Sequence, residues 1–246
     1  MKLMTSLFSM SLLVMIFLIP FLASLLIILY FWYEDKYERE PLSLVLKMFI
    51  WGATSAIFGA IILEYLAIMA LELILPPEIL AIVIPVIVAP IAEEYSKGKG
   101  ILLMRGNEEY EGMMDGLVYG VAIGAGFGLT ENILYGLNAL VFGGLLATVL
   151  LVIIRSSLEI VGHPFFTGWI GSEVGLEKMY GHGGFGKGYL LAVVFHAIWN
   201  SIAIIGSINE TLSISLLGLA VIVYFFLMHK RMARALQLDR ECMKLS

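Results

Sequence analysis

Four short motifs place ionisable side chains inside strongly apolar segments of this chain: Glu93-Glu94-x-x-Lys97, Glu131-Asn132, His163 and His196-x-x-x-Asn200. A charged group in the hydrocarbon core of a bilayer costs about 2.5–3.5 kcal/mol or more, so a chain that keeps several usually uses them. Adjacent carboxylates disfavour each other's ionisation, which suits one of them to take a proton from water. Imidazole and carboxylate groups can also bind zinc or hold a developing oxyanion. Together the motifs predict a hydrolytic site inside a membrane.

The composition is that of a membrane protein. Of the 246 residues, 60% are hydrophobic and 14% are charged, and the mean hydropathy is +0.95. These values are typical of a polytopic protein of the cell membrane, so the predicted fold class is an all-α transmembrane helical bundle. The single cysteine, Cys242, excludes a disulfide within the chain and metal sites built from several cysteines. The sequence has no basic patch with interleaved aromatic residues, so nucleic acid is not an expected partner.

A helix needs about 20 residues to cross the hydrocarbon core. The sequence predicts about seven spans, within a range of six to eight: 8–33, 43–73, 79–104, 114–137, 141–175, 187–206 and 211–233. The first is expected to be a retained helix, because the uncharged run from Leu3 to Tyr33 is about twice as long as the core of a signal peptide. The fifth is long enough for one tilted helix or for a span with a re-entrant piece, and Pro164 could kink it.

Lysine and arginine are distributed unevenly among the loops that these spans define. They lie in or beside loops 1, 3 and 5 and in the tail, whereas loops 2, 4 and 6 contain none; Lys2 and Arg155 fall outside this pattern. The positive-inside rule then predicts an N-terminus outside the cell and a cytoplasmic C-terminus. We expect one integral membrane domain over residues 1–246, a motif-bearing core at about 79–206, and a short basic helix from Lys230 to Ser246.

Each motif also has a purely structural interpretation. Glu93 and Lys97 share a helical face and could neutralise each other, which leaves the second carboxylate without a partner. Glu131 and Asn132 could hydrogen-bond a neighbouring span. A lone histidine is more often a packing residue than a ligand, but two histidines together with three carboxylates favour a shared site.

A row of glycines precedes Glu131 at near-helical spacing: Gly120, Gly124, Gly126 and Gly128. Because no strand lies in front of it, the row predicts a close helix–helix seam instead of a phosphate-binding loop. Among the other polar residues, Asp115 could cap the fourth span. Arg155 could pair with Glu159 or with Glu64, and Glu64 could also serve the site.

Several known hydrolase signatures are absent from the sequence. It contains no H-E-x-x-H motif and no G-x-S-x-G motif, which argues against a zincin and against a serine hydrolase. The Tyr-Asp and Gly-x-Gly-Asp pair expected of intramembrane aspartyl proteases is also missing.

The three longer motifs resemble those of the PrsW family of intramembrane proteases: Glu93-Glu94-x-x-Lys97, Phe127-x-x-x-Glu131-Asn132 and His196-x-x-x-Asn200. The resemblance covers about Pro90 to Ser201 and includes the order and separation of the motifs. The family is related to CAAX prenyl proteases and bacteriocin-immunity proteins. The resemblance implies hydrolysis of a peptide bond in or next to the bilayer, with a membrane-bound substrate such as an anti-sigma factor. The CAAX enzymes end the first motif in Arg where this chain has Lys97, so their detailed mechanism is not carried over.

The leading hypothesis from these residues is an intramembrane endopeptidase acting on a membrane-protein or peptide substrate. Glu93 or Glu94 would activate a water, and Glu131, His163 or both would orient it or hold a metal. His196 and Asn200 would stabilise the oxyanion or protonate the leaving amine. Lys97 and Asn132 would support these residues.

The metal question stays open at the level of sequence. The candidate ligands for a zinc ion are His163, His196, Glu131 and Glu94. The same groups could also run metal-free, glutamate-type chemistry.

Two other function classes remain as alternatives. One is a non-catalytic membrane factor of immunity or chaperone type. The other is a proton-coupled transporter, since buried Glu, His and Lys also build proton relays. Transporters often show inverted repeats, and the sequence has no convincing one.

Overall fold

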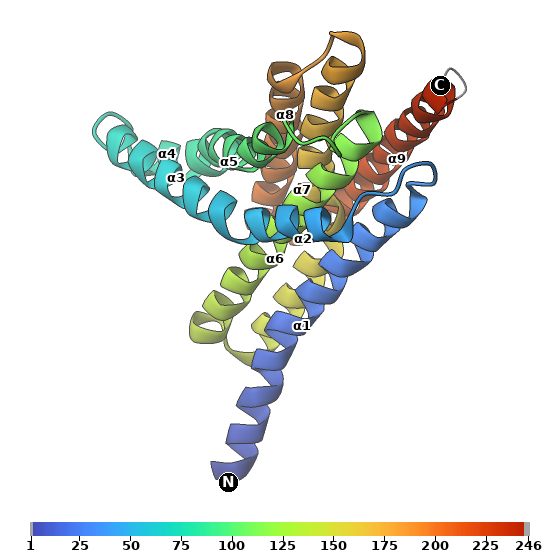
Figure 1. Ribbon diagram of the computed structural model, residues 1–246. Helices are drawn as coiled ribbons and strands as arrows, with labels where there is room; N and C mark the ends of the chain where they lie inside the picture. The colour runs from blue at the N-terminus through green and yellow to red at the C-terminus, as the bar shows by residue number, and fades with distance from the viewer. Residues whose placement is uncertain (1, 244–246) are drawn as a thin grey trace.

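The computed structural model describes the backbone of residues 2–243 and the side chains of residues 11–242 except Glu159. Over this part of the chain all regular elements are helical (Figure 1). In chain order they are α1 (Lys2–Glu34), α2 (Leu42–Trp51), η1 (Gly52–Ala56), α3 (Ile57–Leu71), α4 (Pro77–Val83), η2 (Ile84–Val88), α5 (Ala89–Met104), α6 (Met113–Phe142), α7 (Gly144–Tyr180), α8 (Phe185–Ile204), η3 (Ile205–Ser207) and α9 (Glu210–Met243).

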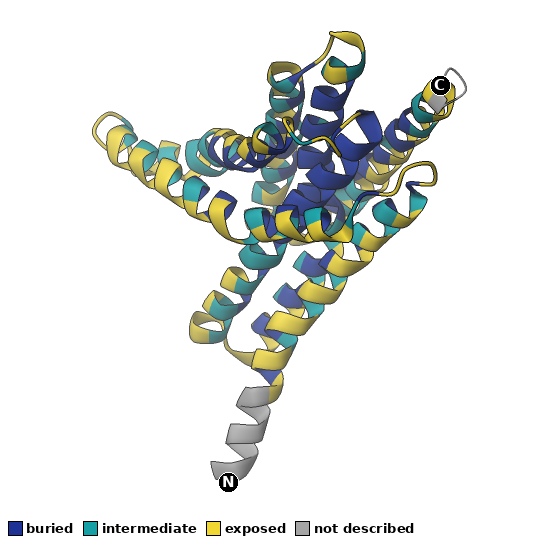
Figure 2. Cartoon of the chain, viewed as in Figure 1, coloured by how far each residue is buried: buried dark blue, intermediate teal, exposed yellow. Residues whose placement is uncertain are grey.

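Seven helical runs in the described chain are long and apolar enough to cross a membrane: Ser11–Glu34, Leu42–Leu71, Pro77–Met104, Met113–Phe142, Gly144–Tyr180, Phe185–Ser207 and Glu210–Cys242. The predicted all-α, seven-span bundle is therefore confirmed. The fifth span is one continuous helix with Pro164 inside it, which answers the question that its length raised. The outer faces of the spans are exposed (Figure 2) and carry many large apolar side chains, as lipid contact requires.

The chain does not start a separate helix in the basic tail. Lys230 and the residues after it continue α9 to Met243. Arg231 explains why this end of α9 packs against the bundle, because its guanidinium Nη2 lies 2.8 Å from Glu173 Oε1 on α7 and both side chains are buried. The basic tail is helical to Met243, as expected, but it extends the seventh span within one helix, and the last residues of the expected helix, 244–246, lie outside the described chain.

Helix α6 lies at the centre of the bundle, and nearly all residues of its first half are buried (Figure 2). Its glycines allow α7 to approach closely, as their spacing predicts. A Cβ on Gly120 would lie 2.4 Å from the carbonyl oxygen of Thr167, and a Cβ on Gly124 would lie 2.3 Å from that of His163. Since backbone atoms cannot move aside as a flexible side chain can, a larger residue at either position would have to push the two helices apart. The seam therefore sets the height and orientation of His163.

Replacing Gly124 with Ala is expected to lower the free energy of unfolding by about 1–3 kcal/mol, because the added methyl group must push α7 away. The matched control is Gly218→Ala in α9, where a Cβ would meet nothing within 4 Å. Alanine has the higher helix propensity, so the control should be neutral or slightly stabilising. Thermal unfolding of the purified variants in detergent measures both. Equal melting temperatures for the two variants would contradict the close seam.

The loops at one end of the bundle gather acidic residues. Asp115 Oδ2 accepts hydrogen bonds of 2.6 Å from the backbone N–H groups of Glu111 and Gly112, which confirms that Asp115 caps α6. Beside it lie Asp35 and Glu40, both from the loop between α1 and α2. Burial and the nearby Asp115 carboxylate raise the pKa of Asp35 to about 7 and the pKa of Glu40 to about 9.

Candidate functional site

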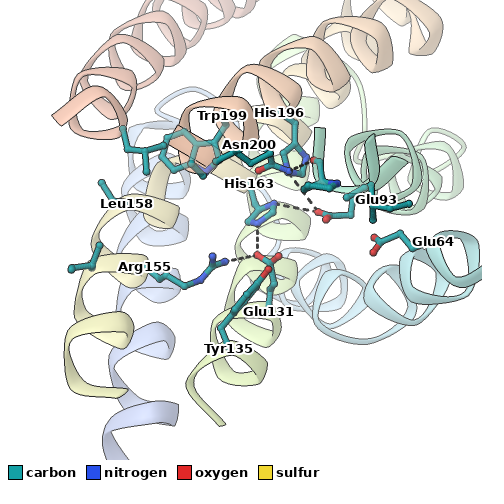
Figure 3. A pocket seen from close by; sticks show the side chains of 17 residues that line it. Glu64, Glu93, Glu131, Tyr135, Arg155, Leu158, His163, His196, Trp199 and Asn200 are labelled. Atoms are coloured by element: carbon teal, nitrogen blue, oxygen red, sulfur yellow. Dashed lines mark hydrogen bonds and ion pairs between the residues drawn. The ribbon is translucent and has the colours of Figure 1, made fainter. Parts of the chain in front are cut away.

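A cavity of about 500 Å³ opens among the spans and brings the four sequence motifs together (Figure 3). Helix α5 contributes the Glu-Glu-Lys motif, α6 contributes the Glu-Asn motif, and α7 and α8 contribute one histidine each. The residues of these motifs that line the cavity are Glu93, Glu131, His163, His196 and Asn200. Four consecutive helices, α5 to α8, therefore bring the motif residues together around one cavity.

The ammonium group of Lys97 lies at the middle of this centre and is completely buried. Its Nζ is 2.6 Å from Glu94 Oε1 and 3.5 Å from Glu93 Oε2. The pairing inferred from the four-residue spacing is therefore the weaker of the two, because Lys97 makes its short contact with the residue three positions back. The face of the Phe127 ring, 4.4 Å from Nζ, adds a cation–π contact.

His196 is oriented by Glu94. Its Nδ1 lies 2.8 Å from Glu94 Oε1, and an ionised carboxylate can only accept, so Nδ1–H is the donor. In neutral His196 the lone pair then lies on Nε2, which is 3.9 Å from Glu93 Oε2. The ring also stacks on Phe166 at a centroid distance of 4.8 Å. His196 thus turns one nitrogen to a buried carboxylate and the other toward Glu93.

His163 is also oriented by a carboxylate, but its proton lies on the other ring nitrogen. Its Nδ1 lies 3.0 Å from Lys97 Nζ, and an ammonium group can only donate, so Nδ1 accepts. The ring proton is then on Nε2, which lies 2.9 Å from Glu131 Oε2. That same oxygen accepts from Arg155 Nη2 at 2.9 Å. Glu131 therefore orients the imidazole and is engaged by two donors, which suits a positioning role better than that of a base.

Arg155 links both polar residues of the α6 motif, since its Nε also donates to Asn132 Oδ1 at 2.9 Å. The sequence offered Glu159 or Glu64 as its partners, and the side chain of Glu159 lies outside the described residues. The sequence had allowed that Glu131 and Asn132 bond a neighbouring span, but it did not identify Arg155 as the partner, because that depends on how α6 and α7 are rotated against each other. Glu64 lines the cavity from α3, as Figure 3 shows.

Glu93 and Glu94 each have a buried Oε2 without a hydrogen-bond partner among the described residues. Glu94 is nevertheless held through its Oε1 by Lys97 and His196, whereas Glu93 Oε2 makes only the longer ion pair with Lys97. It lies 3.9 Å from His163 Nδ1 and 3.9 Å from His196 Nε2. A buried acceptor without a donor is costly unless something not covered by these contacts, such as a water or an ion, meets it. Glu93 is therefore the carboxylate that is best placed to act on a small molecule in the cavity.

Asn200 lines the same cavity but forms its hydrogen bond outside the acid–histidine cluster. Its Nδ2 donates to the carbonyl oxygen of Pro85 at 2.7 Å, in the π-helical turn η2 that leads into α5. This bond uses one of the two N–H groups of the amide. The second N–H group can donate to a ligand in the cavity. Although Asn200 shares a helical face with His196, its hydrogen bond goes to Pro85 and not to the acid–histidine cluster.

The donor set of this centre fits a zinc-type ion. One donor atom each from Glu93, Glu94, His163 and His196 lies within 4.8 Å of the others, and all four residues are buried. Two imidazole nitrogens with one carboxylate form a known catalytic zinc set. The outer nitrogens bond to Glu131 and Glu94, as the second shell of a histidine ligand usually does. If Nδ1 of His163 bound the ion, the ammonium group of Lys97 would have to move away from that nitrogen.

Comparison with known proteins finds a family that matches most of this chain. A model of the PrsW family of intramembrane metalloproteases matches residues 40–229, which include every residue of the cluster. The chain belongs to the PrsW family. Protease PrsW of Geobacillus kaustophilus (strain HTA426) is 32% identical over 152 residues, which are 61% of this chain and 60% of that relative. The match thus spans less than two thirds of the relative's length, and no solved structure matches the chain.

Proposed function

We propose that this PrsW-family protein is an intramembrane endopeptidase that hydrolyses a peptide bond in or next to the bilayer. The observation that carries the proposal is the buried Glu93 Oε2, which has no hydrogen-bond partner among the described residues and faces two imidazoles in a cavity between spans. The expected substrate is a membrane-anchored protein, with an anti-sigma-factor-like regulator as the class that the family resemblance implies.

In the proposed reaction Glu93 takes a proton from a water while the water oxygen attacks the scissile carbonyl carbon. The carbonyl electrons move to its oxygen, and the buried charge of Lys97, with the second N–H of Asn200, stabilises the oxyanion that forms. The C–N bond then breaks as the proton held by Glu93 passes to the leaving nitrogen. Glu94 and Glu131 keep the imidazoles in place throughout.

A zinc-class ion held by Glu94, His163 and His196 would polarise a bound water or the scissile carbonyl and would leave Glu93 as the base. We expect protein purified in detergent to contain about one such ion per chain, as in a catalytic zinc site. His196→Ala should lose most of it, while His182→Ala, in the loop before α8, should keep it. Elemental analysis measures the content. Full cleavage by protein that contains almost no metal would instead establish metal-free, glutamate-type chemistry.

The proposed activity can be tested without knowing the substrate. Membrane fractions from cells that produce either the intact protein or Glu93→Gln are compared by mass spectrometry of protein N-termini. Activity predicts new N-termini, inside or within a few residues of an apolar span, that occur only with the intact protein. If the two samples show the same N-termini at equal amounts of protease, the proposed function is wrong.

A further inference from the structure

A second group of buried carboxylates lies outside the cavity described above. It consists of Asp35 and Glu40 from the loop between α1 and α2, and Asp115 in the first turn of α6. One oxygen from each lies within 4.8 Å of those of the other two. The three residues are only 1%, 4% and 9% exposed, respectively. Carboxylates almost never gather in such burial without a cation or strong hydrogen bonds.

The side chains of this group are held in fixed positions. Asp115 Oδ2 is occupied by the two backbone N–H groups that it caps, which leaves Oδ1 for the cluster. The Tyr119 hydroxyl donates to Glu40 Oε2, and Trp32 Nε1 donates to the carbonyl oxygen of Glu40 at 2.7 Å. These bonds place the carboxylates but supply no positive charge.

Charge around the group is strongly one-sided. Within the described part of the chain, none of the three carboxylates forms an ion pair. The nearby guanidinium of Arg39 instead bonds the backbone carbonyls of Asp35 and Tyr33. Further acidic residues line the two adjoining pockets, of about 120 and 370 Å³: Glu38, Glu108, Glu109, Glu111 and Asp239.

One atom points to a missing ligand independently of the charge. Asp35 Oδ2 is buried and has no hydrogen-bond partner among the described residues. Leaving such an acceptor unsatisfied is costly, and more so when it is charged. Because the carboxylate of Asp35 is within reach of the other two, a single ion could satisfy this oxygen and bind all three residues.

We propose that Asp35, Glu40 and Asp115 bind a hard divalent cation of the Ca²⁺ or Mg²⁺ class. The donors are all oxygen atoms, which these ions prefer over nitrogen and sulfur. Two ligands at about 2.4 Å from one Ca²⁺ ion are at most about 4.8 Å apart, so the observed separations allow shared coordination. The ion would neutralise the group and tie the loop between α1 and α2 to the start of α6. It is separate from the zinc-class site proposed in the cavity.

The test uses full-length protein in detergent with Glu93→Gln and His196→Ala in the background, which disables the cavity donors. Calcium and magnesium chloride are titrated by calorimetry and by thermal unfolding. We expect saturable binding of about one ion per chain and a rise in melting temperature. Asp35→Asn should weaken binding at least about tenfold, because it removes a charged ligand. Glu109→Gln, which alters a pocket-lining carboxylate outside the trio, should bind within about twofold of its parent.

The proposal is overturned if neither ion binds saturably at millimolar concentration, or if Asp35→Asn binds as tightly as Glu109→Gln. Terbium provides a measurement on protein with no substitution, in case Asp35→Asn fails to fold. Tb³⁺ replaces Ca²⁺ and luminesces when a nearby aromatic ring is excited, and the Tyr119 hydroxyl touches Glu40. Luminescence that Ca²⁺ displaces supports the site, and its absence contradicts it.

Discussion

Glu93→Gln is expected to lower the cleavage rate by about 10²–10⁴-fold, the range associated with loss of a general base. The amide keeps the shape of the side chain but cannot take a proton from water. Because Glu93 Oε2 makes no hydrogen bond among the described residues, the substitution breaks none of the short hydrogen bonds of the centre and removes only the 3.5 Å ion pair with Lys97. The effect should therefore fall on the rate constant for cleavage and leave the melting temperature nearly unchanged.

The measurement is single-turnover cleavage, in liposomes, of a reporter built from the first substrate that N-terminal mass spectrometry identifies. Glu78→Gln is the matched control, since Glu78 lies in the same span as Glu93 but is exposed. It should cleave at the rate of the unmodified protein. Glu94→Gln should lose about 10–100-fold, as expected of a residue that orients a histidine. If Glu94→Gln were inactive and Glu93→Gln active, the base would be Glu94.

The sequence predicted the spans well because bilayer thickness imposes a minimum length on every spanning helix, and charge is excluded from most of that length. It also predicted that α5 to α8 share a site. The internal pairing of that site was harder to foresee. Glu93 and Glu94 are both helical neighbours of Lys97, and the sequence does not show which of them the histidines of α7 and α8 hold against the ammonium group.

Two further features could not be read from the sequence, for the same physical reason. Asn200 bonds the carbonyl of Pro85, a contact created by the way α8 packs against the turn η2. Asp35 and Glu40 look like ordinary loop acids in the sequence, yet both are buried. Whether a loop residue is buried depends on which helices pack against the loop, and the local sequence does not show which helices these are.

Lys97→Met is expected to destabilise the protein by about 3–5 kcal/mol, the cost of removing one partner from a buried ion pair. Methionine nearly preserves the volume of the side chain, so the loss reflects charge. Glu94 would keep only the bond from His196, and Glu93 would lose its nearest cation. Reversible unfolding of purified protein in mixed micelles with increasing amounts of a denaturing detergent gives the free energy.

A double-variant cycle separates this charge effect from a packing defect. If Lys97 acts by compensating Glu94, the Glu94→Gln/Lys97→Met protein should be more stable than Lys97→Met alone, because the uncompensated carboxylate is gone. Lys99→Met is the matched control, since Lys99 lies on the exposed face of the same helix. It should change stability by less than about 0.5 kcal/mol. Equal losses for Lys97→Met and Lys99→Met would mean that the buried ammonium group does not hold the acid–histidine centre together.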